Sequence, residues 1–206
     1  MKSLRFLAVL ALSVCLGGIA FAENAADFLA ADLGENEAEE EEGQDFYSMM
    51  FGLYDSVLRQ TATALTEHWE PERLAENGLC PLLANLTPDE VMADCICLGN
   101  DEVVSDYALI LYTESESIDL LSMAVLSGDP FRLVLTASDR NRYTLLRDDE
   151  GYVIAQQSSD SGMLYWRVSP AGDQTLIEGS EVGYEKPENV LGGATMAEYL
   201  WFNMEE

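Results

Sequence analysis

Hydrophobic residues recur at helical spacing through residues 45–70, in the most regular pattern of the chain. Apolar side chains at every third or fourth position form a broad stripe, whereas Asp55 and Arg59 fall on the opposite side. Pro71 follows, and proline cannot continue a helix. The pattern predicts one long amphipathic helix that needs a large apolar surface to pack on.

A different pattern follows residue 105, where short segments rich in β-branched and aromatic residues alternate with turn signals. We expect strands over residues 106–113, 117–126, 131–138, 142–147, 151–157, 163–169 and 174–179. Connections this short favour antiparallel neighbours, because parallel strands need longer crossovers. The segment 117–126 also fits a helix by its apolar content, and we interpret it as a strand.

Residues 80–98 and 193–206 complete the predicted elements. Thr87, Pro88 and Glu90 have the spacing of a helix-capping box, which predicts a helix over 87–98 that packs against a short helix after Cys80. The apolar spacing of 193–206 predicts a closing helix. The fold class is therefore predicted as α+β: an antiparallel β-meander packed against a long N-terminal amphipathic helix, a short helical hairpin and a C-terminal helix.

Residues 1–22 have the three parts of a bacterial-type export signal. Lys2 and Arg5 precede an apolar run, and Ala20 and Ala22 supply the small residues of a cleavage site. The run is shorter than the roughly 20 residues of a membrane span. We expect removal of 1–22 and an exported chain, periplasmic or secreted, that does not dock on membranes. A lipid anchor on Cys15 is disfavoured, because Val14 is larger than a lipobox residue and the chain stays apolar after it.

The next segment, 23–44, contains nine acidic residues and no basic ones. It has too little apolar surface to offset the roughly 1–2 kcal/mol per residue that backbone ordering costs. We predict a disordered acidic leader over 23–44, followed by a single α+β domain over 45–206.

The formal net charge of −28 limits the partners. Loss of Lys2 and Arg5 leaves 8 basic against 38 acidic residues, a net charge of −30. Such a chain repels nucleic acid and anionic lipid surfaces. A basic or amphipathic partner is favoured instead.

Three cysteines, Cys80, Cys95 and Cys97, fall within the predicted helical hairpin. Cys95 and Cys97 lie about 200° apart around a helix, so they cannot bond to each other there. We predict a structural disulfide between Cys80 and Cys95, as oxidising export compartments favour. Cys97 is then an odd thiol, and pairing of Cys80 with Cys97 stays open.

Other candidate chemistry is sparse. His68, the only histidine, lies on the apolar stripe of the first helix and is interpreted as buried or partly buried. Three cysteines and one distant histidine do not make a zinc site, so we expect no metal and no cofactor. No glycine-rich nucleophile turn surrounds any serine.

Half of the positive charge that remains after signal removal lies within sixteen residues. These arginines form a candidate patch for anions or acidic peptides, which could include the chain's own leader: Arg132, Arg140, Arg142 and Arg147. Local pairing of each arginine with a nearby carboxylate is the simpler interpretation.

These observations favour a non-enzymatic binding or accessory module for another exported macromolecule. Two alternatives stay open: a hydrolase that uses carboxylates or His68, and a thiol-linked dimer or redox protein that acts through Cys97. The sequence does not define the oligomeric state.

Overall fold

The computed structural model describes residues 49–99, 104–126, 131–160, 162–177, 183–187 and 193–203. The chain divides into two compact units, Met1–Asp55 and Ser56–Glu206. Only residues 49–55 of the first unit are described, and they are helical with a turn at Tyr54. The predicted signal peptide over 1–22, the predicted leader over 23–44 and Cys15 lie outside the described residues.

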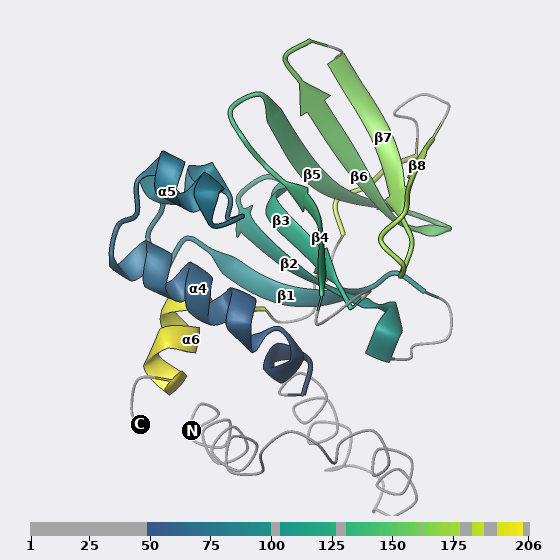
Figure 1. The fold of residues 1–206 in the computed structure, drawn as a ribbon. Coiled ribbons are helices and arrows are strands. Elements are labelled where there is room, and N and C mark those ends of the chain that lie inside the picture. Colours follow the sequence, from purple (N-terminus) through teal and green to yellow (C-terminus); the bar gives the residue numbers. More distant parts are fainter. Residues whose placement is uncertain are drawn as a thin grey trace, which may run out of the picture. The chain divides into compact units, whose positions relative to one another are not determined.

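The second unit is mostly one antiparallel sheet of nine strands with a few short helices (Figure 1). Along the sheet the strand order is β8-β7-β6-β5-β3-β2-β1-β9, and β4 pairs with β3 off this path. In chain order the strands are β1 Met92–Cys97, β2 Tyr107–Glu114, β3 Ile118–Val125, β4 Arg132–Thr136, β5 Asn141–Asp148, β6 Gly151–Ser158, β7 Gly162–Val168, β8 Gln174–Leu176 and β9 Ala194–Thr195. The helices are α4 Asp55–Thr66, α5 Pro71–Glu76 and α6 Met196–Asn203, with short 3₁₀ turns at Pro81–Asn85 and Val104–Asp106.

The predicted fold class is wrong in its helical part. The described residues contain no long N-terminal helix, because α4 covers only twelve residues and ends at Thr66. The backbone leaves the helix at His68, whose φ is +52°. There the N–H of Trp69 donates to Ala64 O (3.0 Å) and the N–H of His68 to Leu65 O (3.4 Å), the bonding of a Schellman helix end.

The predicted helical hairpin is also wrong. One half of the capping box forms, since the backbone N–H and the hydroxyl of Thr87 both donate to Glu90 Oε2 at 2.8 Å, whereas the Glu90 N–H donates to the Thr87 carbonyl at 3.1 Å. It closes only a turn over 88–90, and Met92–Cys97 is strand β1 instead of a helix. Its four central residues are buried whichever face they point to, so the polar-apolar alternation that marks a strand is missing.

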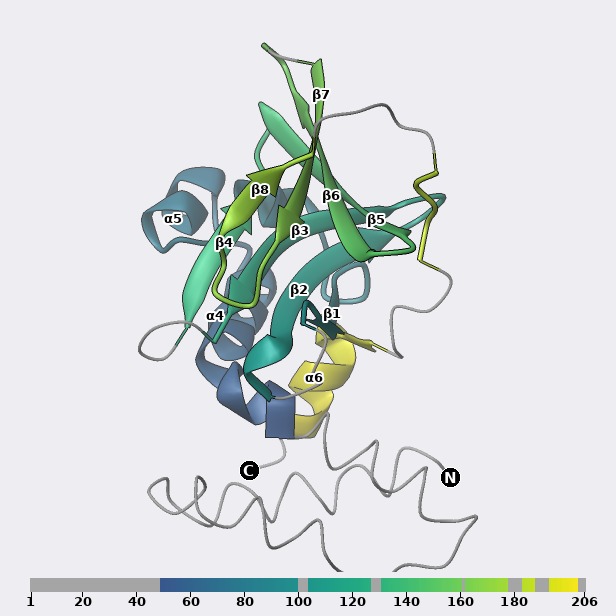
Figure 2. The ribbon, with the colours of Figure 1, turned by 90° about the vertical axis from the view of Figure 1, so that its right-hand side faces the viewer.

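The strand predictions after residue 105 correspond to β2–β8, and the doubtful segment 117–126 contains strand β3. Every strand pair is antiparallel. The sheet is strongly curled, and β8 comes beside β4 (Figure 2), where Gln174 Nε2 donates to Val134 O at 2.9 Å. The curl encloses an apolar core that reaches from Ile96 on β1 to Val168 on β7.

The β9–α6 segment is attached to the first strand. Two residue pairs join β9 to β1: Met92 with Thr195 and Ala93 with Ala194. The N–H of Met196 then donates to Val91 O at 2.8 Å. Thr195 and Glu198 form a capping box at the start of α6. None of the helices in the described ranges has the length and apolar character that a membrane span requires.

Candidate binding groove

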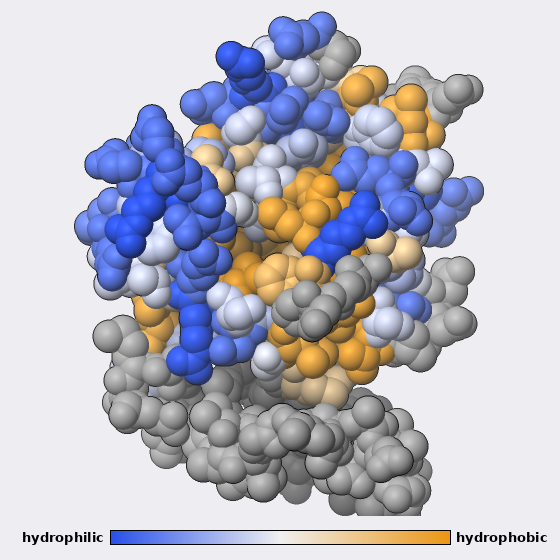
Figure 3. Space-filling view, viewed as in Figure 1, coloured by the Kyte–Doolittle hydropathy of each residue, from blue (hydrophilic) through white to orange (hydrophobic). Residues whose placement is uncertain are grey.

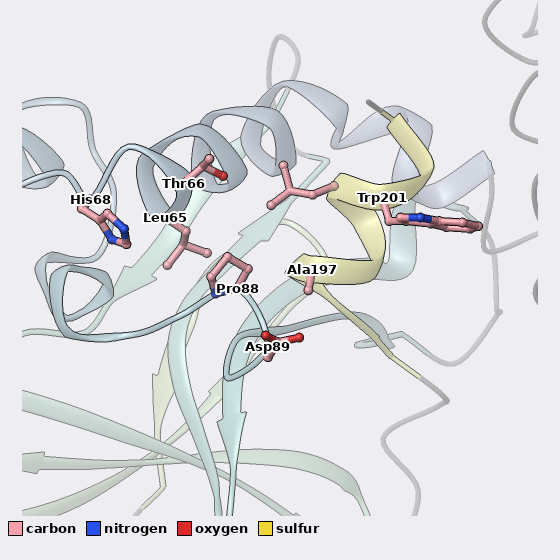
Figure 4. Close-up of a pocket in the computed structure, with 8 residues that line it drawn as sticks. Leu65, Thr66, His68, Pro88, Asp89, Ala197 and Trp201 are labelled. Atoms are coloured by element: carbon pink, nitrogen blue, oxygen red, sulfur yellow. The ribbon is translucent and has the colours of Figure 1, made fainter. Parts of the chain in front are cut away.

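An open groove with a volume of about 530 Å³ lies where the end of α4, the turn at 88–90 and α6 meet. We call it the α4–α6 groove. Its lining residues are Leu65, Thr66, His68, Pro88, Asp89, Ala197, Leu200 and Trp201. In Figure 4, His68 and Trp201 mark opposite ends, with Leu65, Pro88 and Ala197 between them. Five of the eight lining residues are apolar, so the groove suits an apolar or amphipathic ligand.

Local chain geometry places each wall of this groove. The Schellman end of α4 turns the chain at His68, which leaves that side chain exposed at the groove rim. The capping box of Thr87 and Glu90 holds Pro88 and Asp89 in the facing turn. The N–H of Ala197 donates to Pro88 O (3.1 Å) and fixes α6 against that turn.

The rim of the groove is acidic. Asp89 lines it and is exposed, whereas Glu67, between the lining residues Thr66 and His68, is already paired with Arg73 at 3.4 Å. Glu198 follows Ala197 and is exposed as well. The three stretches that line the groove, 65–69, 86–90 and 194–201, contain no lysine or arginine. The groove therefore combines an apolar floor with a negative surrounding.

His68 does not occupy the buried position that the sequence suggested. It is exposed, because α4 ends before it and the apolar stripe stops with the helix. Among the described residues, no side chain hydrogen-bonds to its imidazole. A general base that acts on a nucleophile normally has such an orienting partner, and His68 lacks one in the described part of the chain.

Cys80, Cys95 and Cys97 are free thiols, so the structure does not contain the predicted Cys80–Cys95 bond. The helical-phase argument for that bond fails, because Cys95 and Cys97 lie on strand β1. Cys80 is buried, and its Sγ donates to Ala137 O at 3.2 Å. Burial raises the pKa of Cys80 to about 11, and burial followed by the charge of Asp94 raises the pKa of Cys95 far above its ordinary value. Neither buried thiol is poised to act as a thiolate.

The four arginines of the candidate patch make separate local contacts. Arg132 on β4 lies 3.2 Å from Ala171 O, and the Arg142 guanidinium lies 3.5 Å from Asp139. Arg147 lies over the ring of Tyr152, 5.6 Å from its centroid, and Arg140 is exposed in the turn before β5.

Strand geometry keeps these arginines apart. Arg142 and Arg147 are five residues apart on β5, so their side chains point to opposite faces of the sheet. The structure therefore does not bring all four arginines together. The leader, one of the acidic ligands considered for this patch, lies outside the described residues.

Other surface features are smaller or more dispersed. A second hollow of about 290 Å³ lies over β5–β7, where the rings of Tyr165 and Tyr184 are 5.0 Å apart. Figure 3 shows apolar side chains exposed over the middle of its face, beside the hydrophilic surface around α5. Within the described ranges, no three His, Cys, Asp or Glu side chains are grouped closely enough to hold a metal ion.

Sequence reasoning missed Asp94, the only carboxylate among the fully buried described residues. Its Oδ1 accepts the backbone N–H of Cys95 at 2.6 Å, and within the described part of the chain its Oδ2 has no hydrogen-bond partner. Burial raises the pKa of Asp94 to about 7, and the Cys95 hydrogen bond opposes this shift. The available signal was one aspartate between the small apolar residues Ala93 and Cys95, but a helical interpretation of 87–98 hid it.

Comparison of the chain with protein-family models, with curated protein sequences and with solved structures finds no match. The function must therefore be argued from the geometry of the α4–α6 groove and its acidic surroundings.

Proposed function

We propose that the protein is an exported, non-enzymatic binding module whose α4–α6 groove holds a basic amphipathic segment of another exported protein. The observation that carries this proposal is the apolar groove with an acidic rim and no basic residue in its three lining stretches. Export rests on the signal-like sequence of residues 1–22.

The chemistry of the groove selects the occupant. Leu65, Pro88 and Leu200 offer apolar contact, and the exposed Trp201 offers a large aromatic surface of the kind that dominates binding energy at interfaces. The exposed Asp89 and Glu198 favour lysine or arginine at the edges of the ligand. The net charge of −28 attracts the same partner over longer distances and disfavours an acidic one.

A direct test uses the full chain and two defined peptides. One is a dye-labelled 18-residue peptide of leucine and lysine with helical amphipathic spacing, and the other replaces each lysine with glutamate. Fluorescence anisotropy should show saturable binding of the leucine–lysine peptide that weakens as salt is added. The leucine–glutamate peptide should not bind.

Groove variants locate this binding. Trp201→Ala should weaken binding about tenfold, the equivalent of roughly 1.4 kcal/mol. Leu176→Ala on β8 is the matched control, because Leu176 is 45% exposed and Trp201 is 52% exposed, and it should leave binding unchanged. Asp89→Asn should weaken binding less and reduce its salt dependence, with the exposed Asp149→Asn as the matched control. Equal affinities for the Trp201 and Leu176 variants, or binding of both peptides alike, would contradict the proposal.

A further inference from the structure

The Asp94 carboxyl lies in the core without a counter-charge. Asp94 is 0% exposed. It lies on the same face of β1 as Met92 and Ile96, which pack into the interior of the curled sheet. One carboxyl oxygen accepts the Cys95 N–H, and the other has no hydrogen-bond partner among the described residues. An ionised carboxylate is strongly disfavoured in such a place, whereas a neutral carboxyl is tolerated.

The titratable groups that face Asp94 do not compensate its charge. Tyr112 approaches from β2 and Tyr152 from β6, and burial followed by charge effects that include Asp94 shifts the pKa of both phenols upward. On β1 itself, the neighbours are the Cys95 and Cys97 thiols. Glu114 adds negative charge near Tyr112. The cation that acts on Tyr152 is Arg147, which lies over the Tyr152 ring.

The chain segment that enters β9 lies close to the Cβ atom of Asp94. A Cβ atom at Gly193 would lie 3.3 Å from Asp94 Cβ, 3.0 Å from Tyr112 Oη and only 2.8 Å from Ala93 O. Only glycine fits this approach without a shift of the backbone. The two residues of β9 follow immediately, and α6 then supplies Ala197, Leu200 and Trp201 to the groove.

We propose that Asp94 is a pH-sensitive latch: neutral Asp94 keeps β9 and α6 docked on β1, and its ionisation releases them and opens one wall of the α4–α6 groove. The release of a bound segment on ionisation rests on the proposed function, whereas the movement of β9 and α6 is independent of it.

The geometry selects this segment as the one that yields. An ionised Asp94 needs water, and the neighbouring strand β2 is held to β1 by six residue pairs. β9 pairs with β1 at only two residues, and the Met196 and Ala197 N–H groups donate to Val91 O and Pro88 O next to the buried Met196 side chain. Separating β9 from β1 breaks fewer strand pairs than separating β2 and admits water beside Gly193.

The direction of the pH effect follows from the two states of the latch. Burial raises the pKa of Asp94 to about 7 in the closed state, whereas a hydrated aspartate in the open state titrates near its ordinary value, about 3.9. The open state therefore binds fewer protons between these values. Opening becomes more favourable as pH rises from about 4 to 7, roughly tenfold for each pH unit, and then levels off.

Hydrogen exchange of the full chain tests the latch without any ligand. After correction for the intrinsic exchange rate, protection of amides in 194–200 should fall roughly tenfold per unit between pH 4 and 7. Protection across the β5–β6 pairing, which reports global unfolding, should stay well above that of 194–200 at every pH. Unchanged protection of 194–200 in the wild-type chain, or protection of 194–200 equal to that of β5 and β6 at every pH, would overturn the proposal.

Variants separate the latch from general instability. Asp94→Asn keeps the acceptor for the Cys95 N–H and should abolish the pH dependence of exchange in 194–200. Asp119→Asn, at an exposed position on β3, should retain it. Gly193→Ala should leave 194–200 weakly protected at every pH, because the added methyl meets Ala93 O. A pH dependence that survives in Asp94→Asn would overturn the proposal.

The latch and the proposed function can fail separately. Binding of the leucine–lysine peptide is measured at pH 5, where the latch is closed, and exchange is measured without peptide. Absence of binding at pH 5 would reject the basic amphipathic ligand and leave the exchange result untouched. Hydrogen exchange of 194–200 that does not change with pH, together with peptide binding at pH 5, would reject the latch alone.

Discussion

The β1 end of the sheet and the β5–β8 end differ in where they depart from favourable local chemistry. Among the described residues, the buried polar side-chain atoms without partners are Thr61 Oγ1 on α4 and Asp94 Oδ2 on β1. The non-glycine residue with positive φ, His68, closes α4. At the β5–β8 end the positive φ values belong to glycines such as Gly151 and Gly162 in turns.

Two aspartates show the difference most directly. Asp94 on β1 is buried without a cation, and its pKa is raised. Asp148 at the end of β5 accepts a 2.6 Å hydrogen bond from Arg167, and although burial acts to raise its pKa, that bond and neighbouring backbone N–H groups lower it. One sheet therefore contains carboxyls of opposite pH dependence. Natural folds tend to accept such local costs at sites of function, and of these departures His68 lines the groove directly.

The largest expected effect comes from Asp94→Asn. A pKa of about 7 in the folded state against about 3.9 unfolded means that the folded state holds the extra proton between these values. Wild-type stability should therefore fall as pH rises from 4 to 7, by at most about 4 kcal/mol. Urea unfolding at pH 4 and pH 8 should show this loss in the wild-type chain and not in the variant. A variant less stable than wild type at pH 8 would contradict the assignment of a costly buried charge.

Truncation of one side chain at each end of the sheet should give the next largest difference in unfolding free energy. Ile96 on β1 is 0% exposed within the apolar core, whereas Leu176 on β8 is 45% exposed. Ile96→Ala should cost about 3 kcal/mol of unfolding free energy, and Leu176→Ala less than about 0.5 kcal/mol. Chemical denaturation with both variants at one pH measures the difference. Equal costs would show that the β8 end is packed as tightly as β1.

Asp148→Asn should give a smaller effect with the opposite pH dependence. The Asp148–Arg167 pair is partly exposed, so its loss should cost about 1 kcal/mol at pH 7. Because the folded-state pKa is lowered, this contribution is present above pH 4 and disappears as pH falls further. Unfolding midpoints at pH 7 and pH 3 check the prediction, and a cost that persists at pH 3 would contradict it.

The same two ends differ in what the sequence predicts. Strands β5–β7 could be located because turn residues separate them and their apolar positions partly alternate. Strand β1 could not be located, because it is buried on both faces and follows a capping sequence at Thr87 and Glu90 whose hydrogen bonds do form in part. The capping sequence closes only one turn, and pairing with β2 determines the conformation of residues 92–97.

The candidate groove was harder to predict than the sheet. Residues 65–68, 88–89 and 197–201 come from three distant segments, and no local pattern brings them together. His68 could be singled out as the only histidine, but its exposure depends on where α4 ends. That point is fixed by a left-handed residue at a position where glycine is usual, and the sequence has no glycine there to signal it.

His68→Gly should give the smallest effect, and it should stabilise the protein. A non-glycine residue in the left-handed region destabilises the folded state by about 1–2 kcal/mol. Glycine avoids this strain, but it loses about 0.5–1 kcal/mol more conformational entropy on folding. The net gain should be roughly 0.5–1 kcal/mol, seen as a higher urea midpoint with an unchanged slope.

His68→Ala serves as the control, because it removes the imidazole but keeps a side chain at φ +52°. Backbone strain accounts for the gain only if the alanine variant gains nothing, and equal stabilisation by both would assign it to the imidazole. A glycine variant less stable than wild type would mean that the imidazole stabilises the end of α4. If His68→Gly is more stable and also binds the leucine–lysine peptide less tightly, His68 supports binding at the expense of stability, which would extend the contrast between the groove end and the β5–β8 end to function.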